Sequence, residues 1–385
     1  MPDDTTTKPI DSGNIAPAEN RLLYYIALGL VPGIGGTLAK RLIAKCGSAE
    51  AVFREKKALL QKVSGIGATI AHKITGQQVL QRAEKECAFL LKNNFHGLCY
   101  IDDKYPQRLA QCEDGPVVLF VNGTVDFNQT KILSIVGTRQ ATPYGLERCE
   151  AIVAQLAARG HAPVIVSGLA YGIDICAHKA ALNNHLPTVA VMATGLDKIY
   201  PSLHHATAKQ ITAQEGALVT DFLSDTKPDR QNFVQRNRII AGLADATLVV
   251  ESGEKGGALI TAGLALSYNR DVLAVPGRAG DPCSKGCNAL IRSNRAALVE
   301  NIADIEYALG WDPQEKEKAQ QLSLFAPLSG EGKMIVETLK ANPAATIDAI
   351  CYATKIPMSR LSALLFKMEI DNLLRTLPGK RYELK

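Results

Sequence analysis

The sequence lacks the features that mark membrane, secreted and disulfide-bonded proteins. No apolar run approaches the ~20 residues that a membrane-spanning helix requires. Residues 1–14 are polar and acidic, unlike a secretory signal or an Arg-rich transit peptide. The nine cysteines are scattered and odd in number, which argues against full disulfide pairing. We therefore expect a cytoplasmic protein that does not associate with a membrane.

A large excess of charge of one sign is also lacking. The 43 Lys and Arg against 38 Asp and Glu leave a net charge of +5. Residues 131–310 carry 17 basic against 16 acidic residues, and residues 330–385 carry 9 against 6. A nucleic-acid site on this chain must therefore be a focused pocket rather than a uniformly basic surface.

Signatures of catalysis and metal binding are missing too. The G-x-S-x-G nucleophile elbow is absent, and Cys283 and Cys287 have no second Cys/His pair at zinc spacing. We expect no catalytic residue, no metal and no cofactor.

What the sequence does contain divides the 385 residues into five segments. Its 46% hydrophobic and 21% charged residues indicate a folded chain, which is too long for one ordinary domain. We predict a disordered N-terminus over 1–19, an all-α region over 20–98, an α/β core over 99–310, a linker over 311–329 and a small domain over 330–385.

Two glycine-containing turns interrupt the helical region, at residues 31–35 and 63–67. Each follows an apolar helix pattern and opens another, which resembles a pair of helix-hairpin-helix motifs. Such turns can present backbone N–H groups to a phosphate at a helix start. They can equally be tight connections in a small bundle that need glycine for positive φ. The sequence leaves both interpretations open.

The core segment alternates short apolar runs with helical patterns of 10–15 residues. Runs that are apolar on both faces, separated by helices, predict a Rossmann-like, doubly wound and mostly parallel sheet. Ligands of such sheets bind beyond the carboxyl ends of the strands, where the strand order reverses. The runs lie at 132–136, 164–167, 188–193, 217–220, 246–250, 272–275 and 296–299.

The first two strand ends carry candidate phosphate ligands. Gly137, Thr138 and Arg139 combine close backbone approach, a hydroxyl group and a guanidinium just before a helix start. The second turn, residues 167–174, holds Gly168 and Gly172 but does not match the G-x-G-x-x-G dinucleotide pattern.

The helix after the second turn adds Lys179 and His178, and His178 can equally be a packed helix residue. After the third strand, Lys198 and Tyr200 offer a charge and a ring. Tyr200, which precedes a proline, can instead simply cover the core edge.

The densest polar cluster follows the fourth strand of the core. Arg236, Asn237 and Arg238 are expected at a helix start, where the macrodipole disfavours cations unless an anion compensates them. That anion is either a substrate phosphate or an internal carboxylate such as Asp174 or Glu251. At least one of the arginines, Arg238 above all, is a candidate for an internal ion pair.

A further glycine-rich turn enters a helix after the next strand, with Lys255, Gly256 and Gly257. The strand ends would then place several amide-lined turns on one rim. An unpaired strand needs such donors for its phosphates and rings on which its bases stack. The candidate rings are Tyr144, Phe222 and Phe233.

Taken together, these motifs resemble the DprA/Smf family over essentially all of residues 100–305. The matching segments are GTR (137–139), SGLAYGID (167–174), RNRIIAGLADATLVVESGEKGGALITAG (236–263), VPG (275–277) and GCNALI (286–291). The chain departs from the family's usual residues at Val234, His204 and Gly256.

The resemblance implies a non-catalytic protein that binds single-stranded DNA, forms a homodimer through the core and loads a RecA-type recombinase during natural transformation. It assigns the DNA contact to Arg139 and to the pocket formed with the Arg236–Arg238 block.

The last segment predicts a winged helix, with about three helices and two short strands around residues 378–379. Its candidate recognition helix, 359–368, exposes few cations, which is little for reading a major groove. Contact with protein or weak non-specific contact with DNA is the expectation.

The competing function is a Rossmann-like nucleotide-binding enzyme that cleaves nucleoside monophosphates. Such enzymes place an acidic residue after a glycine-rich loop. Here the loop at 253–261 is followed by no Glu up to Asn269, so hydrolysis would lack its general base.

Overall fold

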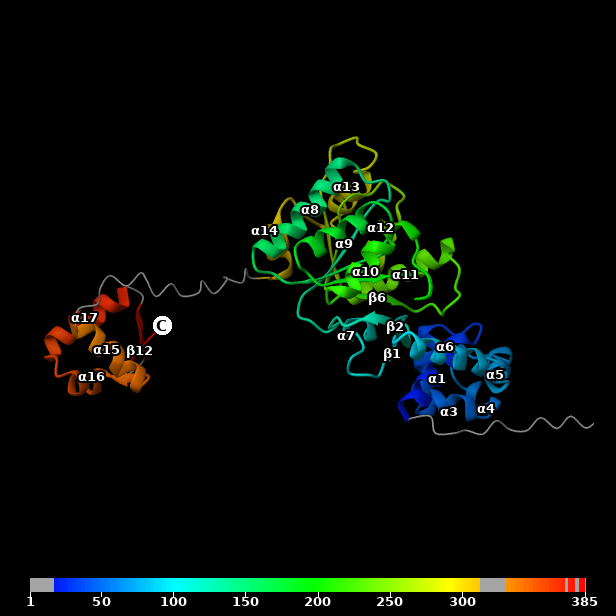
Figure 1. The fold of residues 1–385 in the computed structure, drawn as a ribbon, viewed down its shortest axis with the longest axis horizontal. Coiled ribbons are helices and arrows are strands. Elements are labelled where there is room, and N and C mark those ends of the chain that lie inside the picture. The colour runs from blue at the N-terminus through cyan, green and yellow to red at the C-terminus, as the bar shows by residue number, and fades with distance from the viewer. Residues whose placement is uncertain (1–16, 312–329, 371–372, 378–380, 385) are drawn as a thin grey trace, which may run out of the picture. The chain divides into compact units, whose positions relative to one another are not determined.

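The computed structural model describes residues 17–311, 330–370, 373–377 and 381–384 (Figure 1). Its contacts form two compact units that divide between Glu315 and Lys316. No helix in the described ranges combines the length and the apolar character needed to cross a bilayer.

Two expected segments, the disordered N-terminus over 1–19 and the linker over 311–329, lie mostly outside the described residues. Their described ends are ordered. Pro17 begins helix α1, and Trp311 is buried, with its ring 5.9 Å from that of His161 and beneath the ammonium of Lys131.

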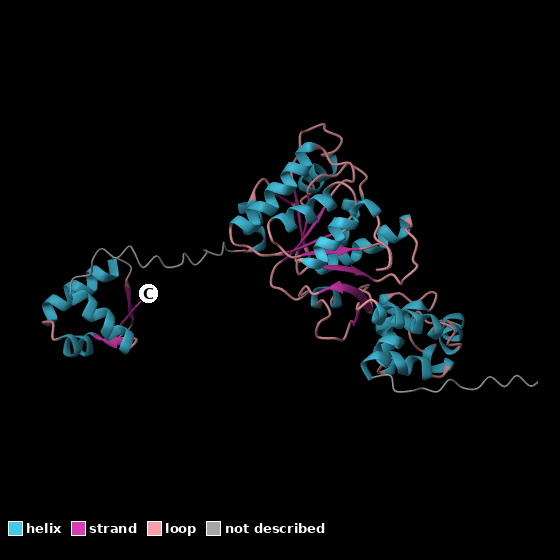
Figure 2. Cartoon of the chain, in the orientation of Figure 1, coloured by secondary structure: helices cyan, strands magenta, loops and turns pink. Residues whose placement is uncertain are grey.

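The first unit is built on a nine-stranded sheet with the order β1-β2-β6-β5-β4-β3-β7-β8-β9. Figure 2 draws the strands in magenta, with helices around them in cyan. Neighbouring strands from β6 to β9 in this order are parallel, which confirms the predicted doubly wound sheet. Strands β1 and β2, which the sequence analysis missed, extend it in antiparallel pairing. The strands are β1 (His96–Cys99), β2 (Val118–Gly123), β3 (Ile132–Val136), β4 (Val164–Ser167), β5 (Thr188–Val191), β6 (Ala217–Thr220), β7 (Ala246–Val249), β8 (Asp271–Ala274) and β9 (Ala297–Leu298).

Helices cover both faces of this sheet, so its central strands are buried on both sides. Along β4, Val164 and Val166 pack in one apolar core with α11 and α12, whereas Ile165 packs in the other with α8, α9 and α14. The helices of this part are α7 (Gln107–Ala110), α8 (Pro143–Ala158), α9 (Ile173–Asn183), η1 (Ser202–His204), α10 (His205–Ala213), α11 (Arg230–Leu243), α12 (Gly257–Ser267), α13 (Lys285–Arg292) and α14 (Ile302–Leu309).

The strand order reverses between β3 and β7. From β3 the chain proceeds to β4, β5 and β6 on one side, and then returns to β7, β8 and β9 on the other. The loops that leave β3 and β7 therefore part in opposite directions, which opens a crevice at this position.

The helical region also belongs to the first unit and packs against the β1–β2 end of the sheet (Figure 1). Both glycine turns form: Gly33 and Gly65 have φ of 98° and 91°, which a side chain would disfavour. Its helices are α1 (Pro17–Leu30), α2 (Gly36–Cys46), α3 (Ala49–Arg54), α4 (Lys57–Leu60), α5 (Ala68–Thr75) and α6 (Leu80–Lys92).

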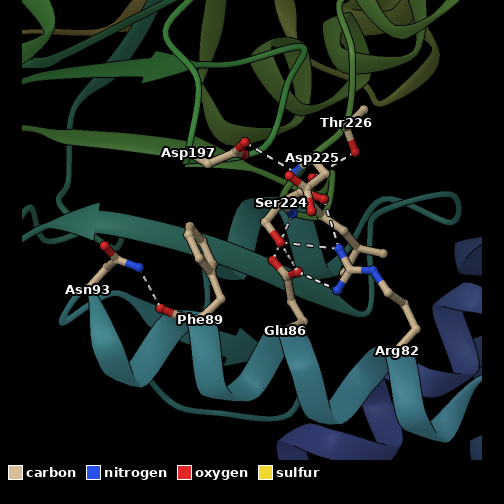
Figure 3. Close-up of polar contacts among 9 residues, drawn as sticks. Arg82, Glu86, Phe89, Asn93, Asp197, Ser224, Asp225 and Thr226 are labelled. Atoms are coloured by element: carbon tan, nitrogen blue, oxygen red, sulfur yellow. Dashed lines mark hydrogen bonds and ion pairs between the residues drawn. The ribbon is translucent and has the colours of Figure 1, made fainter.

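A buried carboxylate fastens α6 to the loop that follows β6 (Figure 3). Glu86, only 1% exposed, accepts hydrogen bonds from the backbone N–H of Ser224 at 2.9 Å and from its hydroxyl at 2.6 Å. Arg82 pairs with Glu86 at 2.8 Å and donates to the carbonyl of Ser224 at 2.8 Å. This network satisfies the buried charge and orders the loop that runs on to α11.

The second unit is the predicted winged helix. Its three-stranded antiparallel sheet has the order β10-β12-β11, and one apolar core joins it to the helices. Its elements are α15 (Gly330–Ala341), β10 (Ala345–Thr346), α16 (Ile347–Thr354), α17 (Met358–Ile370), β11 (Leu374–Leu377) and β12 (Arg381–Leu384).

Candidate nucleic-acid interface

A groove of about 1040 Å³ lies at the strand-order reversal. The β3–α8 loop, the β7–α12 loop and the first turns of α11 form its walls. Nine of the predicted site residues line it: Gly137, Thr138, Arg139, Phe233, Arg236, Asn237, Lys255, Gly256 and Gly257.

Arg139 and Phe233 meet across the groove. The guanidinium carbon of Arg139 lies 4.8 Å from the centre of the Phe233 ring, within cation–π distance. Arg139 is exposed and forms no ion pair with any described residue. Its charge is therefore available to an anion that enters the groove.

Tyr200 also lines the groove, although the sequence allowed it to be a mere cover of the core edge. Its ring lies 5.6 Å from that of Phe233 and is 44% exposed. The two rings, tilted by 57° to each other, and the Arg139 guanidinium thus lie next to one another and offer faces on which unpaired bases can stack. Of the other candidate rings, Tyr144 donates to the carbonyl of Pro276 and Phe222 lines a different cavity.

The β7–α12 loop brings amide and ammonium donors to the opposite wall. Gly256 is the N-cap of α12, and its position provides no side chain to cap the first backbone N–H groups. Those donors, with the partial positive charge of the helix start and with exposed Lys255, favour an anion.

Glu251 fixes the β3–α8 loop from beneath. Its two carboxylate oxygens accept from the backbone N–H of Thr142 at 2.8 Å and from the hydroxyl of Thr142 at 2.7 Å. Its carbonyl accepts from the N–H of Thr138 at 2.8 Å. Glu251 therefore holds in place the loop that carries Arg139.

Arg236 is buried, which favours the internal of the two alternatives that the sequence left open. It is only 3% exposed and donates to the carbonyl oxygens of Gly168, at 2.6 Å, and of Val191. Burial lowers the pKa of Arg236 to about 10, while the carboxylate of Asp174 opposes the shift. Burial likewise raises the pKa of Asp174, and the guanidinium of Arg236 counteracts it. Arg236 is thus held by internal partners and supports the groove from below.

The expected helix start is wrong. Helix α11 begins at Arg230, with Asp229 as N-cap, so Arg236–Arg238 lies in mid-helix and the macrodipole conflict does not arise. Residues 230–241 contain neither proline nor glycine, which permits the earlier start.

Gly168 and Gly172 lie outside the groove lining, and neighbouring groups occupy the space that a side chain at either position would need. A Cβ at Gly168 would collide with the Arg236 guanidinium, and one at Gly172 with the carbonyl of Thr138. Gly172 also has φ of 74°. Both glycines let the turns close around the groove floor.

Three of the predicted cationic ligands lie outside the groove lining. Arg238 forms an ion pair with Asp221 and donates to the carbonyl of Asp114, because two positions along α11 turn it away from Arg236. Lys179 and Lys198 are exposed but lie outside the lining, on α9 and after β5.

Three side chains that could assist hydrolysis, those of Glu251, Asp174 and His178, interact with other groups of the protein. Both oxygens of Glu251 are occupied by Thr142, and Asp174 is paired electrostatically with Arg236. His178 is fully buried and bonded to Thr188 at 2.7 Å, which makes it a packed helix residue. In the described ranges, no group of three His, Cys, Asp or Glu residues could hold a metal ion.

Two family models match the chain. The model of DNA recombination-mediator protein A matches residues 96–310, and the DprA winged helix domain matches residues 319–380.

Similar full-length proteins share about a third of the sequence. Protein Smf of Synechocystis is 32% identical over 407 aligned positions, which cover 95% of this chain and 99% of that protein. Protein Smf of Escherichia coli is 32% identical over 317 positions, covering 78% and 83%.

Two solved structures are similar as well. DprA from Streptococcus pneumoniae matches with a TM-score of 0.64 and 30% identity, over 75% of this chain and 98% of that one. DNA processing protein A from Helicobacter pylori matches with a TM-score of 0.50 and 29% identity, over 56% and 95%. The latter structure concerns that protein's single-stranded DNA binding mode.

Proposed function

The chain belongs to the DNA recombination-mediator protein A (DprA/Smf) family, and from this premise we propose that it binds single-stranded DNA in the groove between β3 and β7. The observation that carries the proposal is the exposed Arg139 guanidinium, which forms no ion pair with a described residue and lies 4.8 Å from the ring centre of Phe233 where the strand order reverses. The proposed contact residues are the predicted residues that line the groove, without the buried Arg236 and with Tyr200 added.

The groove suits an unpaired strand better than a duplex. Stacking on Phe233 and Tyr200 requires base faces that a duplex keeps covered. Arg139, Lys255 and the first amides of α12 would hold phosphates, which carry no sequence information. Binding should therefore show little sequence preference and weaken with salt, at a slope of about −0.7 per phosphate contacted.

A labelled-oligonucleotide titration tests this proposal. Arg139→Glu should nearly abolish binding of a single-stranded oligonucleotide and leave the unfolding temperature unchanged, because the side chain is exposed. The matched control is Lys179→Glu, the same reversal on an exposed residue outside the groove, which should bind as the wild type does. Equal loss in both variants, or in neither, would refute the groove as the site.

We further propose that the protein is not a hydrolase. Both carboxylate oxygens of Glu251 accept hydrogen bonds from Thr142, which disfavours this side chain as the base that activates water. Release of free base from a panel of nucleoside monophosphates checks this, and turnover that Glu251→Gln abolishes would establish the enzyme instead.

The remaining proposals rest on the family resemblance. They are homodimerisation through the core, loading of a RecA-type recombinase on the bound strand during natural transformation, and action in the cytoplasm. The nine cysteines, all without disulfides, are compatible with a reducing compartment. Faster recombinase filament assembly on single-stranded DNA in the presence of this protein would support the loading function.

A further inference from the structure

The two glycine turns of the helical region are copies of one local structure. Residues 31–42 and 63–74 share the pattern Val-x-Gly-Ile-Gly-x-Thr at the same spacing. In each, the isoleucine N–H bonds the valine carbonyl at 3.0 Å, as seen for Ile34 and Ile66. We call these segments hairpin 1 (31–42) and hairpin 2 (63–74).

The hairpins also pack on each other as equivalent partners. The open side of Gly33 faces the side chain of Ile70, and that of Gly65 faces Leu38. Gly33 and Gly65 occupy matching positions, as do Leu38 and Ile70. A chemical role of one hairpin can therefore be compared residue by residue with the other.

Hairpin 1 binds oxygen atoms of this same chain. Thr37 donates to the carbonyl of Glu113, and Arg41 pairs with the carboxylate of Glu113 at 3.1 Å. Lys40 donates to the carbonyl of Cys112 at 2.6 Å. Its three side-chain donors are thus used on the acidic segment 112–114.

Gly36 leaves the space that the segment around residues 112–115 needs in order to pack against hairpin 1. A Cβ on Gly36 would collide with the carbonyl of Gly115, so only glycine fits there. Hairpin 2 has Ala68 at the matching position, and Ala68 is exposed. No described segment covers hairpin 2 in the same way.

The donors of hairpin 2 lack such partners. Thr69, His72 and Lys73 match Thr37, Lys40 and Arg41, and all three are exposed. Thr69 and Lys73 make no side-chain hydrogen bond or ion pair with any described residue, and the His72 ring contacts only Lys57, at 3.0 Å.

Charge accumulates around hairpin 2. Residues 45–73 contain six Lys and Arg against two Glu, whereas the whole chain has a net charge of only +5. All six cations are exposed, and only Arg54 is paired, with Glu50. They are Lys45, Arg54, Lys56, Lys57, Lys62 and Lys73.

We propose that hairpin 2 is a second DNA contact, which binds backbone phosphates through Thr69, Lys73 and the neighbouring lysines. Hairpin 1 shows in the same molecule that this donor set holds oxygen atoms, and hairpin 2 offers it to an external anion with added positive charge. The choice of DNA as the anion rests on the proposed function.

The surface favours a nucleic-acid backbone over an acidic protein. Protein partners usually need a buried aromatic or apolar anchor, whereas phosphates need only cations and amide or hydroxyl donors. Leu59 is the single large apolar side chain exposed in residues 45–73, all of which the structure describes.

The test compares two double variants of the full-length chain. Lys62→Ala/Lys73→Ala removes two cations of hairpin 2, and Lys92→Ala/Lys209→Ala removes two exposed lysines elsewhere. With a 60-nucleotide oligo(dT), the first variant should bind about five- to tenfold more weakly at low salt. Its plot of log K against log salt should be shallower by about 1.4, which corresponds to two lost phosphate contacts. The second variant should match the wild type.

Each outcome separates this inference from the groove. Unchanged affinity and slope in Lys62→Ala/Lys73→Ala, with Arg139→Glu inactive, would overturn the inference and leave the groove standing. Weakened binding in the hairpin variant, with Arg139→Glu fully active, would support hairpin 2 and refute the groove. If the hairpin variant loses affinity for poly-glutamate but keeps its affinity for DNA, the surface binds acidic protein and the inference fails. Unchanged thermal unfolding excludes a folding defect.

Discussion

Two arginines lie near the ring of Phe233, and their surroundings give them different roles. Arg139 is exposed and 4.8 Å from the ring centre, so its charge can meet a phosphate. Arg236, 5.9 Å from the same ring, is buried and bonded to backbone carbonyls. One arginine therefore contacts the ligand, while the other holds the floor on which the ring rests.

Tyr200 provides a matched test of stacking. Tyr200→Ala should weaken binding of single-stranded DNA by about 1 to 2 kcal/mol, because one base loses its aromatic partner. Tyr171→Ala is the control, since Tyr171 is 45% exposed, much as Tyr200 is at 44%, but lies outside the groove lining. Equal losses in the two variants would show that Tyr200 has no specific role.

Burial of His178 should make stability depend on pH. Burial, with the nearby Arg236 charge, lowers its pKa from 6.5 to about 3 in the folded chain. The Thr188 hydroxyl already donates to the carbonyl of Ile165, so it accepts from Nδ1–H of His178 and leaves Nε2 unprotonated and without a partner.

The unfolded chain takes up this proton below pH 6.5 and the folded chain does not, so the free energy of unfolding must fall as pH drops from 6.5 toward 3. The fall should approach about 1.4 kcal/mol per pH unit for one group. His178→Gln should flatten it, as measured by denaturant unfolding at pH 7 and pH 5, whereas His205→Gln on the surface should not. An unchanged pH dependence in His178→Gln would contradict the assignment.

The sequence predicted some of the groove residues, but it could not predict which way individual side chains point. Arg139 could be identified as a groove residue from the sequence, because Gly137, Arg139 and the start of a helix follow one another at the end of a single strand. The sequence could not separate Arg236 from Arg238, since inward or outward direction depends on where α11 begins and which face it buries. Tyr200 could not be assigned for the same reason: exposure of a ring depends on tertiary packing.

At the scale of elements, the parallel strands were predictable because burial on both faces leaves an unbroken apolar run. Strands β1 and β2 were missed, although residues 117–121 form such a run ahead of the segment on which the prediction was built. Strand β1 has only four residues, of which only Cys99 is buried, so its sequence resembles a loop.

The junction between α6 and the β6–α11 loop should depend on one carboxylate. Glu86→Ala leaves the N–H and hydroxyl of Ser224 without their acceptor, so we expect a loss of about 2 to 4 kcal/mol in the free energy of unfolding. The exposed neighbour Glu84→Ala should stay within about 0.5 kcal/mol. Hydrogen exchange should accelerate in residues 221–229 of the first variant only, and equal exchange in both would contradict the fastening role.

We expect the C-terminal unit of the protein to contribute little to the proposed strand binding. The winged helix has its own core, and its candidate recognition helix α17 carries only two cations, Arg360 and Lys367. Arg360 on α17 pairs with Glu331 at 3.0 Å, and Arg375 on β11 pairs with Glu383. This charge pairing favours a minor role in strand binding.

Removal of residues 330–385 should therefore change the affinity for single-stranded DNA by less than about threefold at constant salt, since a lost peripheral contact is worth well under 1 kcal/mol. Titration of the truncated chain against the full-length chain measures this. A loss as severe as that of Arg139→Glu would instead place the main site on the winged helix.

Photo-crosslinking tests the central claim, that the groove between β3 and β7 holds the strand, most directly. Oligo(dT) with 5-iodouracil at single positions should attach to Phe233 or Tyr200 on irradiation, as located by mass spectrometry of the digested protein, and Arg139→Glu should remove these adducts. Adducts confined to other surfaces, such as α17 or the exposed side of α9, with neither groove ring labelled, would contradict the account.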